Sequence, residues 1–213
     1  MTIIAIDGTF SSGKGTLAKK LAAHYGFGYL DSGKLYRAVA HKALTDHIAL
    51  DDNVACAKLA QTLISSDLND PILKSGPVGE AASKVAVHPD VRAALLTFQQ
   101  DFANKPAKPF KGAVLDGRDI GTVICPNADV KLYVDADPNI RAERRYKELL
   151  GYGESITYAE VLAQLSERDT RDMTRAKSPL KPANDAHLLD TSNLSIEAAF
   201  EAAKMVVDAV LNG

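Results

Sequence analysis

A segment close to the N-terminus has the residue types and spacing of a loop that binds phosphate groups. Along the chain it reads Gly8-Thr9-Phe10-Ser11-Ser12-Gly13-Lys14-Gly15-Thr16. Glycines allow successive backbone N–H groups to turn toward one anion, and the helix expected after the loop adds the positive end of its dipole. Lys14 supplies a mobile positive charge that can neutralise the charge developing during phosphoryl transfer. The segment therefore predicts a phosphate-binding loop between a strand and a helix.

The loop alone does not identify a reaction, because GTPases, ATPases and small-molecule kinases all carry one. Gly15 stands directly after the lysine, where the strict pattern has Ser or Thr, so Mg²⁺ is expected to be held through waters and phosphates. The simpler alternative is a glycine-rich turn beside a solvated lysine. No Asn-Lys-x-Asp segment for guanine recognition is present, since Asn104-Lys105 continues into Pro106-Ala107. A compact P-loop kinase is therefore favoured.

The elements that must position this loop alternate between short apolar runs and longer stretches with helical spacing. Strands are expected at residues 2–6, 29–31, 113–116, 130–134 and 187–190. Helices are expected at residues 14–25, 32–45, 51–65, 89–104, 139–150 and 158–171, with a last helix capped by Ser195. Glycines and prolines mark a loop at 67–79. This alternation predicts an α/β fold with a five-stranded parallel sheet flanked by helices, whose ligands bind at the carboxyl ends of the strands.

Composition excludes several classes of protein. The 213 residues carry 25 Lys and Arg against 27 Asp and Glu, and a net charge of −2 argues against a dedicated nucleic-acid binder. Cys56 and Cys125 are too few for a disulfide framework and are expected to be packing residues. No apolar stretch approaches the length of a membrane span. We therefore expect a cytoplasmic monomer that acts on small molecules, with no membrane or nucleic-acid partner.

Beyond the loop, the sequence resembles the bacterial cytidylate kinases in several segments. The similarity begins with Gly-Lys-Gly-Thr at 13–16, which is typical of nucleoside monophosphate kinases. It continues with Leu-Asp-Ser-Gly-Lys-Leu-Tyr-Arg at 30–37, Asp-Gly-Arg-Asp-Ile-Gly-Thr-Val at 116–123 and Glu-Arg-Asp-Thr-Arg-Asp-Met-Thr-Arg at 167–175. Ser-Pro-Leu at 178–180 and Asp-Thr-Ser at 190–192 match the C-terminal segments of that family. Because these motifs occur in the family's order, they are far more specific than the loop alone.

The resemblance implies one P-loop kinase domain over residues 1–213, with a helical acceptor-binding insert at 38–105 and a lid at 139–176. The insert is shorter than in many relatives, and its β-rich part is reduced to the loop at 67–79. Two residues depart from the family loop, since Thr9 replaces a proline and Ser11 replaces a glycine. Either Ser11 adopts a backbone conformation that glycine adopts more easily, or the loop differs locally from that of the family. The implied reaction moves the γ-phosphoryl group of ATP to CMP or dCMP, with Mg²⁺.

The resemblance also implies roles for single residues. Those expected to be catalytic, by neutralising phosphate charge, are Lys14, Arg118 and Arg175. Those expected to contact ATP are Gly8, Thr9, Phe10, Ser11, Ser12, Gly13, Lys14, Gly15, Thr16, Arg141 and Arg145. Those expected to contact the acceptor are Ser32, Arg37, Ser83, Arg92, Arg118, Asp119, Arg168, Asp172 and Arg175. No direct protein ligand to Mg²⁺ is expected, with Thr16 and Asp116 acting through waters.

Within the acceptor group, Ser83, Arg92 and Asp119 match the base-reading positions, and Asp119 is expected to accept from the N4 amino group of cytosine. Arg168 and Asp172 match the positions that contact the ribose and lie one helical turn apart.

Other interpretations remain open at this stage. A P-loop kinase acting on another nucleoside monophosphate, or on a small-molecule hydroxyl with Asp116 or Asp119 as base, would carry the same loop. A nucleotide-binding switch or scaffold without turnover is a third possibility, although a switch needs no second anion site. Taken alone, the charged run at 167–175 is typical of a solvated helix face. Tyr36 fits either the core or a pocket wall.

Overall fold

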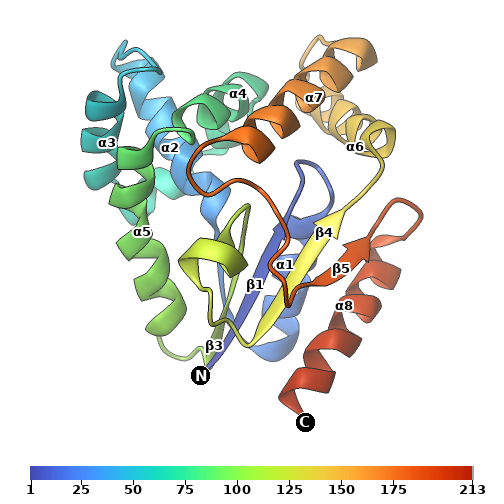
Figure 1. Ribbon diagram of the computed structural model, residues 1–213. Coiled ribbons are helices and arrows are strands. Elements are labelled where there is room, and N and C mark those ends of the chain that lie inside the picture. The colour runs from blue at the N-terminus through green and yellow to red at the C-terminus, as the bar shows by residue number, and fades with distance from the viewer. Residues whose placement is uncertain (213) are drawn as a thin grey trace.

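Five short strands form one parallel sheet at the centre of the molecule (Figure 1). The computed structural model describes residues 1–212 and orders the strands β2-β3-β1-β4-β5. Their bounds are β1 Thr2–Gly8, β2 Gly28–Asp31, β3 Gly112–Gly117, β4 Val130–Asp135 and β5 His187–Asp190. The predicted α/β class and all five predicted strands are confirmed. β1 pairs with β3 on one side and β4 on the other, so the phosphate-binding segment leaves the sheet from its middle.

Helices enclose the sheet and extend beyond its carboxyl edge. They are α1 Lys14–Tyr25, α2 Ser32–Thr45, α3 Asn53–Gln61, α4 Gly76–Val85, α5 Pro89–Asn104, α6 Pro138–Gly151, α7 Tyr158–Thr174 and α8 Ile196–Leu211. Three short turns, η1 Ser65–Asn69, η2 Pro71–Lys74 and η3 Ile120–Ile124, complete the elements. In Figure 1, α2, α3, α4 and α5 lie to one side of the sheet, while α6 and α7 lie above the end of β4.

Each face of the sheet has its own apolar core. On one face, the helices α1 and α8 contribute Leu17, Leu21 and Val207 to a cluster with the strand side chains Ile4 and Ile6. On the other face, α5 and η3 cover a second cluster, built on alternate residues of the same strands. Burial of both faces explains why these strands are continuous apolar runs and not alternating ones.

The predicted loop at 67–79 is wrong over its last residues, because the structure begins α4 at Gly76, a helix that the sequence did not predict. Pro77 lies in the first turn, where the missing N–H of proline costs nothing. The helix predicted at 51–65 is also too long: α3 begins after Asp52, whose side chain accepts from the Ala55 N–H, and ends at Gln61. The helix capped by Ser195 is confirmed by a bond from the Ala198 N–H to its hydroxyl.

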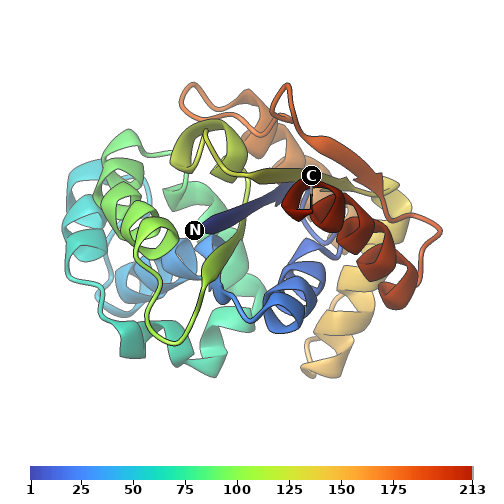
Figure 2. The same ribbon diagram turned by 90° about the horizontal axis from the view of Figure 1, so that it is seen from below.

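Two further helical groups have small cores of their own. One joins α2, α3, α4 and α5 around Leu35, Val39, Cys56 and Leu95, so Cys56 is a packing residue as predicted. The other joins α6 and α7 around Leu149 and Leu165. Both groups stand at the carboxyl edge of the sheet, and both chain ends lie at the opposite edge (Figures 1 and 2). No helix within residues 1–212 is long and apolar enough to cross a membrane.

Candidate active site

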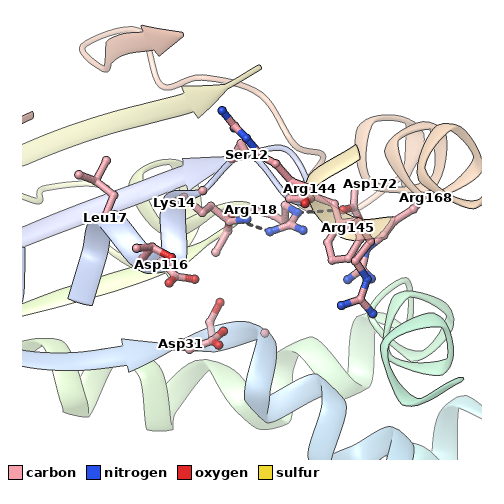
Figure 3. Close-up of a pocket in the computed structure, with 18 of the residues that line it drawn as sticks. Ser12, Lys14, Leu17, Asp31, Asp116, Arg118, Arg144, Arg145, Arg168 and Asp172 are labelled. Atoms are coloured by element: carbon pink, nitrogen blue, oxygen red, sulfur yellow. Dashed lines mark hydrogen bonds and ion pairs between the residues drawn. The ribbon is translucent and has the colours of Figure 1, made fainter. Parts of the chain in front are cut away.

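A cavity of about 650 Å³ opens at the carboxyl ends of β1, β2 and β3, within the size range of ligand-binding pockets (Figure 3). The loop before α1 forms its floor, and side chains from α2, α4, α5, α6 and α7 surround it. Most of the predicted site residues line this cavity. They are Phe10, Ser11, Ser12, Gly13, Lys14, Gly15, Thr16, Ser32, Arg37, Ser83, Arg92, Asp116, Arg118, Asp119, Arg145, Arg168, Asp172 and Arg175.

The backbone of the loop has the turns that a phosphate cradle needs. Gly8 has φ 153°, and a Cβ at this position would lie 1.9 Å from the carbonyl oxygen of Val134 in β4. Gly13, directly before α1, has φ 88°. Ser11 has φ 62°, which confirms that this serine takes up a left-handed conformation that glycine adopts more easily. The loop therefore keeps its curvature despite the two departures from the family sequence.

Lys14 lies over the loop, with its ammonium group folded back onto the backbone. Its Nζ donates to the Thr9 carbonyl oxygen at 3.1 Å, and the Ser12 hydroxyl donates to the same oxygen at 3.0 Å. Burial, together with the nearby Arg118 guanidinium, lowers the pKa of Lys14 to about 7. Asp116 and Asp31 oppose this lowering only in part, and a phosphate group in the cavity would add further negative charge beside the ammonium group.

Three residues assigned to ATP lie outside the cavity lining. Gly8 and Thr9 begin the loop but do not line the cavity, and the Thr9 hydroxyl donates to Asp135 Oδ1 at 2.6 Å. Arg141 is 3 % exposed, and it donates to the carbonyl oxygens of Ala136 at 2.8 Å and Phe10 at 3.2 Å. These contacts fix the loop from behind. The expected direct contact of these three residues with ATP has no support in their positions.

The arginines on the other side of the cavity are held by two buried aspartates. Arg118 Nε donates to Asp172 Oδ2 at 2.9 Å, and Arg92 pairs with Asp119. Arg175 lies between them, with guanidinium nitrogens 3.8 Å from Asp119 and 3.9 Å from Asp172. Burial alone would raise the pKa of Asp172, but Arg118 and its neighbouring arginines hold it below its usual value. The charged run at 167–175 is therefore partly buried at this site and is not only a solvated helix face.

Two guanidinium groups at the cavity have N–H donors that form no hydrogen bond within the described residues. Within residues 1–212, Arg168 Nε and Arg175 Nη2 are buried and have no hydrogen-bond partner. Burial lowers the pKa of Arg168 to about 9, because its charge is poorly compensated there. Arg37 donates to the Leu73 carbonyl oxygen at 2.6 Å, and burial lowers its pKa also. Buried donors without partners and poorly compensated positive charge are features that an anion bound in this part of the cavity would satisfy.

Carboxylates flank Lys14 on the sheet side of the cavity. Asp31 and Asp116 are register partners at the ends of β2 and β3, and Tyr29 donates to Asp116 Oδ2 at 2.7 Å. Burial and the neighbouring Asp31 raise the pKa of Asp116 to about 6. Among residues 1–212, no group of three His, Cys, Asp or Glu side chains could hold a metal ion unaided. A divalent cation here would need phosphate and water oxygens in addition to those of the protein.

Asp7, a residue that the sequence did not single out, connects β1 to the Arg118–Asp119 segment. Its carboxylate oxygens accept from the N–H groups of Ile120 at 2.7 Å and Gly121 at 2.8 Å. Burial raises the pKa of Asp7 to about 7, although these two bonds oppose the shift. The signal in the sequence was an acidic residue at the end of an otherwise apolar strand.

Arg144, in the predicted lid, and Thr191, in the family segment at 190–192, were not among the residues predicted to contact a ligand. Arg144 donates to the Thr191 carbonyl oxygen at 2.6 Å, and both residues line the cavity. The Thr191 hydroxyl in turn donates to the Ser12 carbonyl oxygen at 2.7 Å, so the turn after β5 supports the phosphate loop. Tyr36 is both a core residue and a cavity wall, because it is 8 % exposed and lines the cavity.

Comparison with solved structures shows the same fold in distant proteins. An uncharacterized protein from Eubacterium ventriosum superposes with a TM-score of 0.55 at 16 % identity, over 100 % of both chains. A sugar kinase from Janibacter sp. superposes with a TM-score of 0.51 at 14 % identity, over 99 % of this chain and 98 % of its own. These likenesses support the predicted P-loop kinase fold and say nothing of the substrate.

Sequence relatives are much closer. A cytidylate kinase from Brucella suis biovar 1 is 53 % identical over 209 residues, which cover 98 % of this chain and 94 % of the relative. A cytidylate kinase from Rhodopseudomonas palustris is 55 % identical over 211 residues, covering 99 % and 98 %. The sequence model of the cytidylate kinase family matches residues 4–209. With nearly its whole length matched, the chain belongs to the cytidylate kinase family.

Proposed function

We propose that this chain transfers the γ-phosphoryl group of ATP to CMP or dCMP, giving ADP and CDP or dCDP. The observation that carries the proposal is one cavity with two anion sites, the loop around Lys14 and the arginine group around Arg118 and Arg175. A phosphoryl transfer between two phosphates needs both anions held in line. Membership of the cytidylate kinase family supports cytosine nucleotides as the acceptors.

The chemistry asked of the side chains is charge neutralisation and positioning. The acceptor phosphate is already anionic near neutral pH, so it needs no strong general base. Lys14, Arg118 and Arg175 are proposed to neutralise the charge that spreads over the transferred group and to hold the two phosphates together. Arginine suits this role, because its planar fork binds phosphate through two bonds and keeps its charge when buried.

On the acceptor side, Arg37 is proposed to bind the phosphate, Arg168 and Asp172 the ribose, and Ser83, Arg92 and Asp119 the base. Asp119 is the proposed acceptor for the N4 amino group of cytosine, whereas uracil would place a carbonyl oxygen against this carboxylate. The Arg92–Asp119 ion pair supports the assignment, because it holds both groups at the cavity wall in fixed positions. Ser32, at the first turn of α2, is the remaining proposed contact.

On the donor side, the N–H groups and side chains of Phe10 to Thr16 are proposed to hold the ATP phosphates, with Arg145 beside them. Mg²⁺ fits the oxygen donors of Thr16 and Asp116, which line the cavity near Lys14. When bound, it would neutralise phosphate charge. Residues 38–105 are proposed as the acceptor-binding insert and residues 139–176 as the lid. The reaction needs a single chain, so a monomer is expected.

The test measures ADP release from ATP and Mg²⁺ with CMP, dCMP, UMP, AMP or shikimate as the acceptor. Turnover is expected with CMP and dCMP; turnover only with shikimate, or with none of the five, would refute the proposal. The variant Asp119→Ala should raise KM for CMP and narrow the gap between CMP and UMP. Asp101→Ala, on the exposed side of α5, is the matched control and should change neither KM for CMP nor the CMP/UMP ratio. An unchanged CMP/UMP ratio in Asp119→Ala would remove Asp119 from base recognition.

A further inference from the structure

A second layer of contacts joins α7 to α4 immediately behind the cavity wall. The two bonds from Arg171 Nη2 reach the Glu80 carboxylate at 2.8 and 2.9 Å. Its Nε donates to the Ser83 hydroxyl oxygen at 3.1 Å. Ser83 lines the cavity, whereas Arg171 does not. Of the three residues that its guanidinium group bonds, only Ser83 lines the cavity.

The bond from Arg171 restricts what the Ser83 hydroxyl can do. Ser83 is 2 % exposed, and within residues 1–212 its hydroxyl accepts this one bond and donates none. A serine hydroxyl has one proton and two acceptor lone pairs. With one lone pair taken by Nε–H, the proton and the second lone pair are available to a ligand in the cavity. The Ser83 side chain is thus held in one orientation before a ligand arrives.

The geometry of this contact requires arginine. Nη2 faces Glu80 on α4 while Nη1 pairs with Glu167 one turn earlier on α7, so both ends of the guanidinium plane are fixed. Nε–H lies in that same plane and is thereby aimed at Ser83. A lysine could keep an ion pair with Glu80, but it has no Nε–H in a fixed plane.

We propose that Arg171 is a positioning residue for base recognition, which fixes the Ser83 hydroxyl and thereby raises the preference for cytosine over uracil. The inference rests on the proposed function, in which Ser83 contacts the base. Because Arg171 lies on α7 and Ser83 on α4, the base contact is complete only while these two helices are joined. Recognition of the base is thereby tied to the packing of the proposed lid against the proposed insert.

The test compares Arg171→Ala, Arg171→Lys and the control Glu167→Gln, which removes the charge at position 167 but keeps an oxygen that can accept from Arg171 Nη1. For Arg171→Ala we expect KM for CMP to rise about tenfold, the value of one hydrogen bond to a charged donor, with KM for ATP unchanged. The ratio of kcat/KM between CMP and UMP should fall about fivefold or more. Arg171→Lys should have an unchanged melting temperature and a lowered CMP/UMP ratio of kcat/KM. Glu167→Gln should have the melting temperature and the CMP/UMP ratio of the unmodified protein.

A double-mutant cycle with Ser83→Ala separates positioning from a general structural role. Once Ser83 has no hydroxyl, removing Arg171 should cause no further loss of the CMP/UMP ratio. Additive losses, or an Arg171→Lys variant with an unchanged ratio, would overturn the proposal. A protein that phosphorylates CMP while giving either of those results refutes only the role of Arg171. A protein that does not use CMP at all refutes the proposed function itself.

Discussion

Asp7 gives a prediction whose sign and size both depend on its position. The residue is 4 % exposed at the end of β1, and burial raises its pKa from 3.8 to about 7. Between these two values the folded state keeps a proton that the unfolded chain has released. Because stability falls with pH wherever the folded state binds more protons, Asp7 lowers the free energy of unfolding as the pH rises from about 4 to 7.

The perturbation is Asp7→Asn, which has a similar shape and no titration. In the wild type, the contribution of Asp7 to the free energy of unfolding falls by about 2.5 kcal/mol between pH 5 and pH 8. This figure follows from about 1.4 kcal/mol for each pKa unit of the shift. All other groups are shared, so the stability of the variant relative to the wild type should improve by that amount over this interval. For a chain of this length the change corresponds to roughly 5–10 °C in Tm difference.

The assay is urea unfolding of both proteins at pH 5, 6, 7 and 8 and constant ionic strength. Asn has one carbonyl oxygen for the two N–H groups of Ile120 and Gly121, so the variant should be the less stable protein at pH 5. This deficit should shrink or reverse by pH 8. Parallel stability curves from pH 5 to pH 8 would show that Asp7 does not titrate in this interval, and the reasoning from burial would fail. Asp101→Asn, on an exposed side chain, is the control and should give parallel curves.

Four further substitutions test the phosphate-binding segment at residues 8–16. Gly8→Ala should lower the free energy of unfolding, measured in urea, by about 3 kcal/mol or more, because the added Cβ would overlap the Val134 carbonyl oxygen. Gly13→Ala, where the added Cβ meets open space, should lower it by about 1 kcal/mol. Lys14→Met should lower kcat at least 100-fold, because the charge that neutralises the phosphates is lost. It should nevertheless raise Tm, because it removes an ammonium group that is costly to bury, as its pKa of about 7 indicates. A lower Tm would contradict this expectation. Phe10→Leu should raise KM for CMP more than KM for ATP, because the Phe10 ring lies 4.0 Å from the Arg168 guanidinium; equal changes in both constants would argue against this contact.

The sequence predicted the elements well where periodicity and capping agree, and less well where composition misled. The helix at 14–25 has the predicted bounds, because the glycines at Gly13 and Gly26 end its pattern on both sides. α4 was missed because Gly76, Pro77 and Gly79 are residues of loops as well as of a helix's first turn. Apolar contacts with α2 stabilise this helix, and such contacts join positions that no local pattern shows.

The site itself was predicted as a set of residues and not as a network. The family resemblance pointed to Arg118, Asp119 and Arg175. The structure places all three residues in the lining of one cavity. The resemblance could not show which carboxylate holds which guanidinium, because those pairs join the turn after β3 to α5 and α7, which are distant from it in the chain. Asp7 was missed for the same reason. Its partners are backbone N–H groups 113 and 114 residues away, and no side-chain motif marks them.

The net charge of −2 is compatible with a site for two anions because the positive charge is concentrated and held in place. Asp119 and Asp172 each contact two arginines, so the guanidinium groups are fixed without any substrate. Fixed charges lose little freedom when a phosphate binds, and donors aimed in advance at the reacting group are the ones that lower a barrier. Arg175 Nη2 is buried 3.8 Å from Asp119 Oδ1 and has no hydrogen-bond partner within the described chain, so we propose it as a donor to the acceptor phosphate. On this proposal, the aspartates set the geometry of the acceptor site, and the donors without partners contribute to its affinity for phosphate.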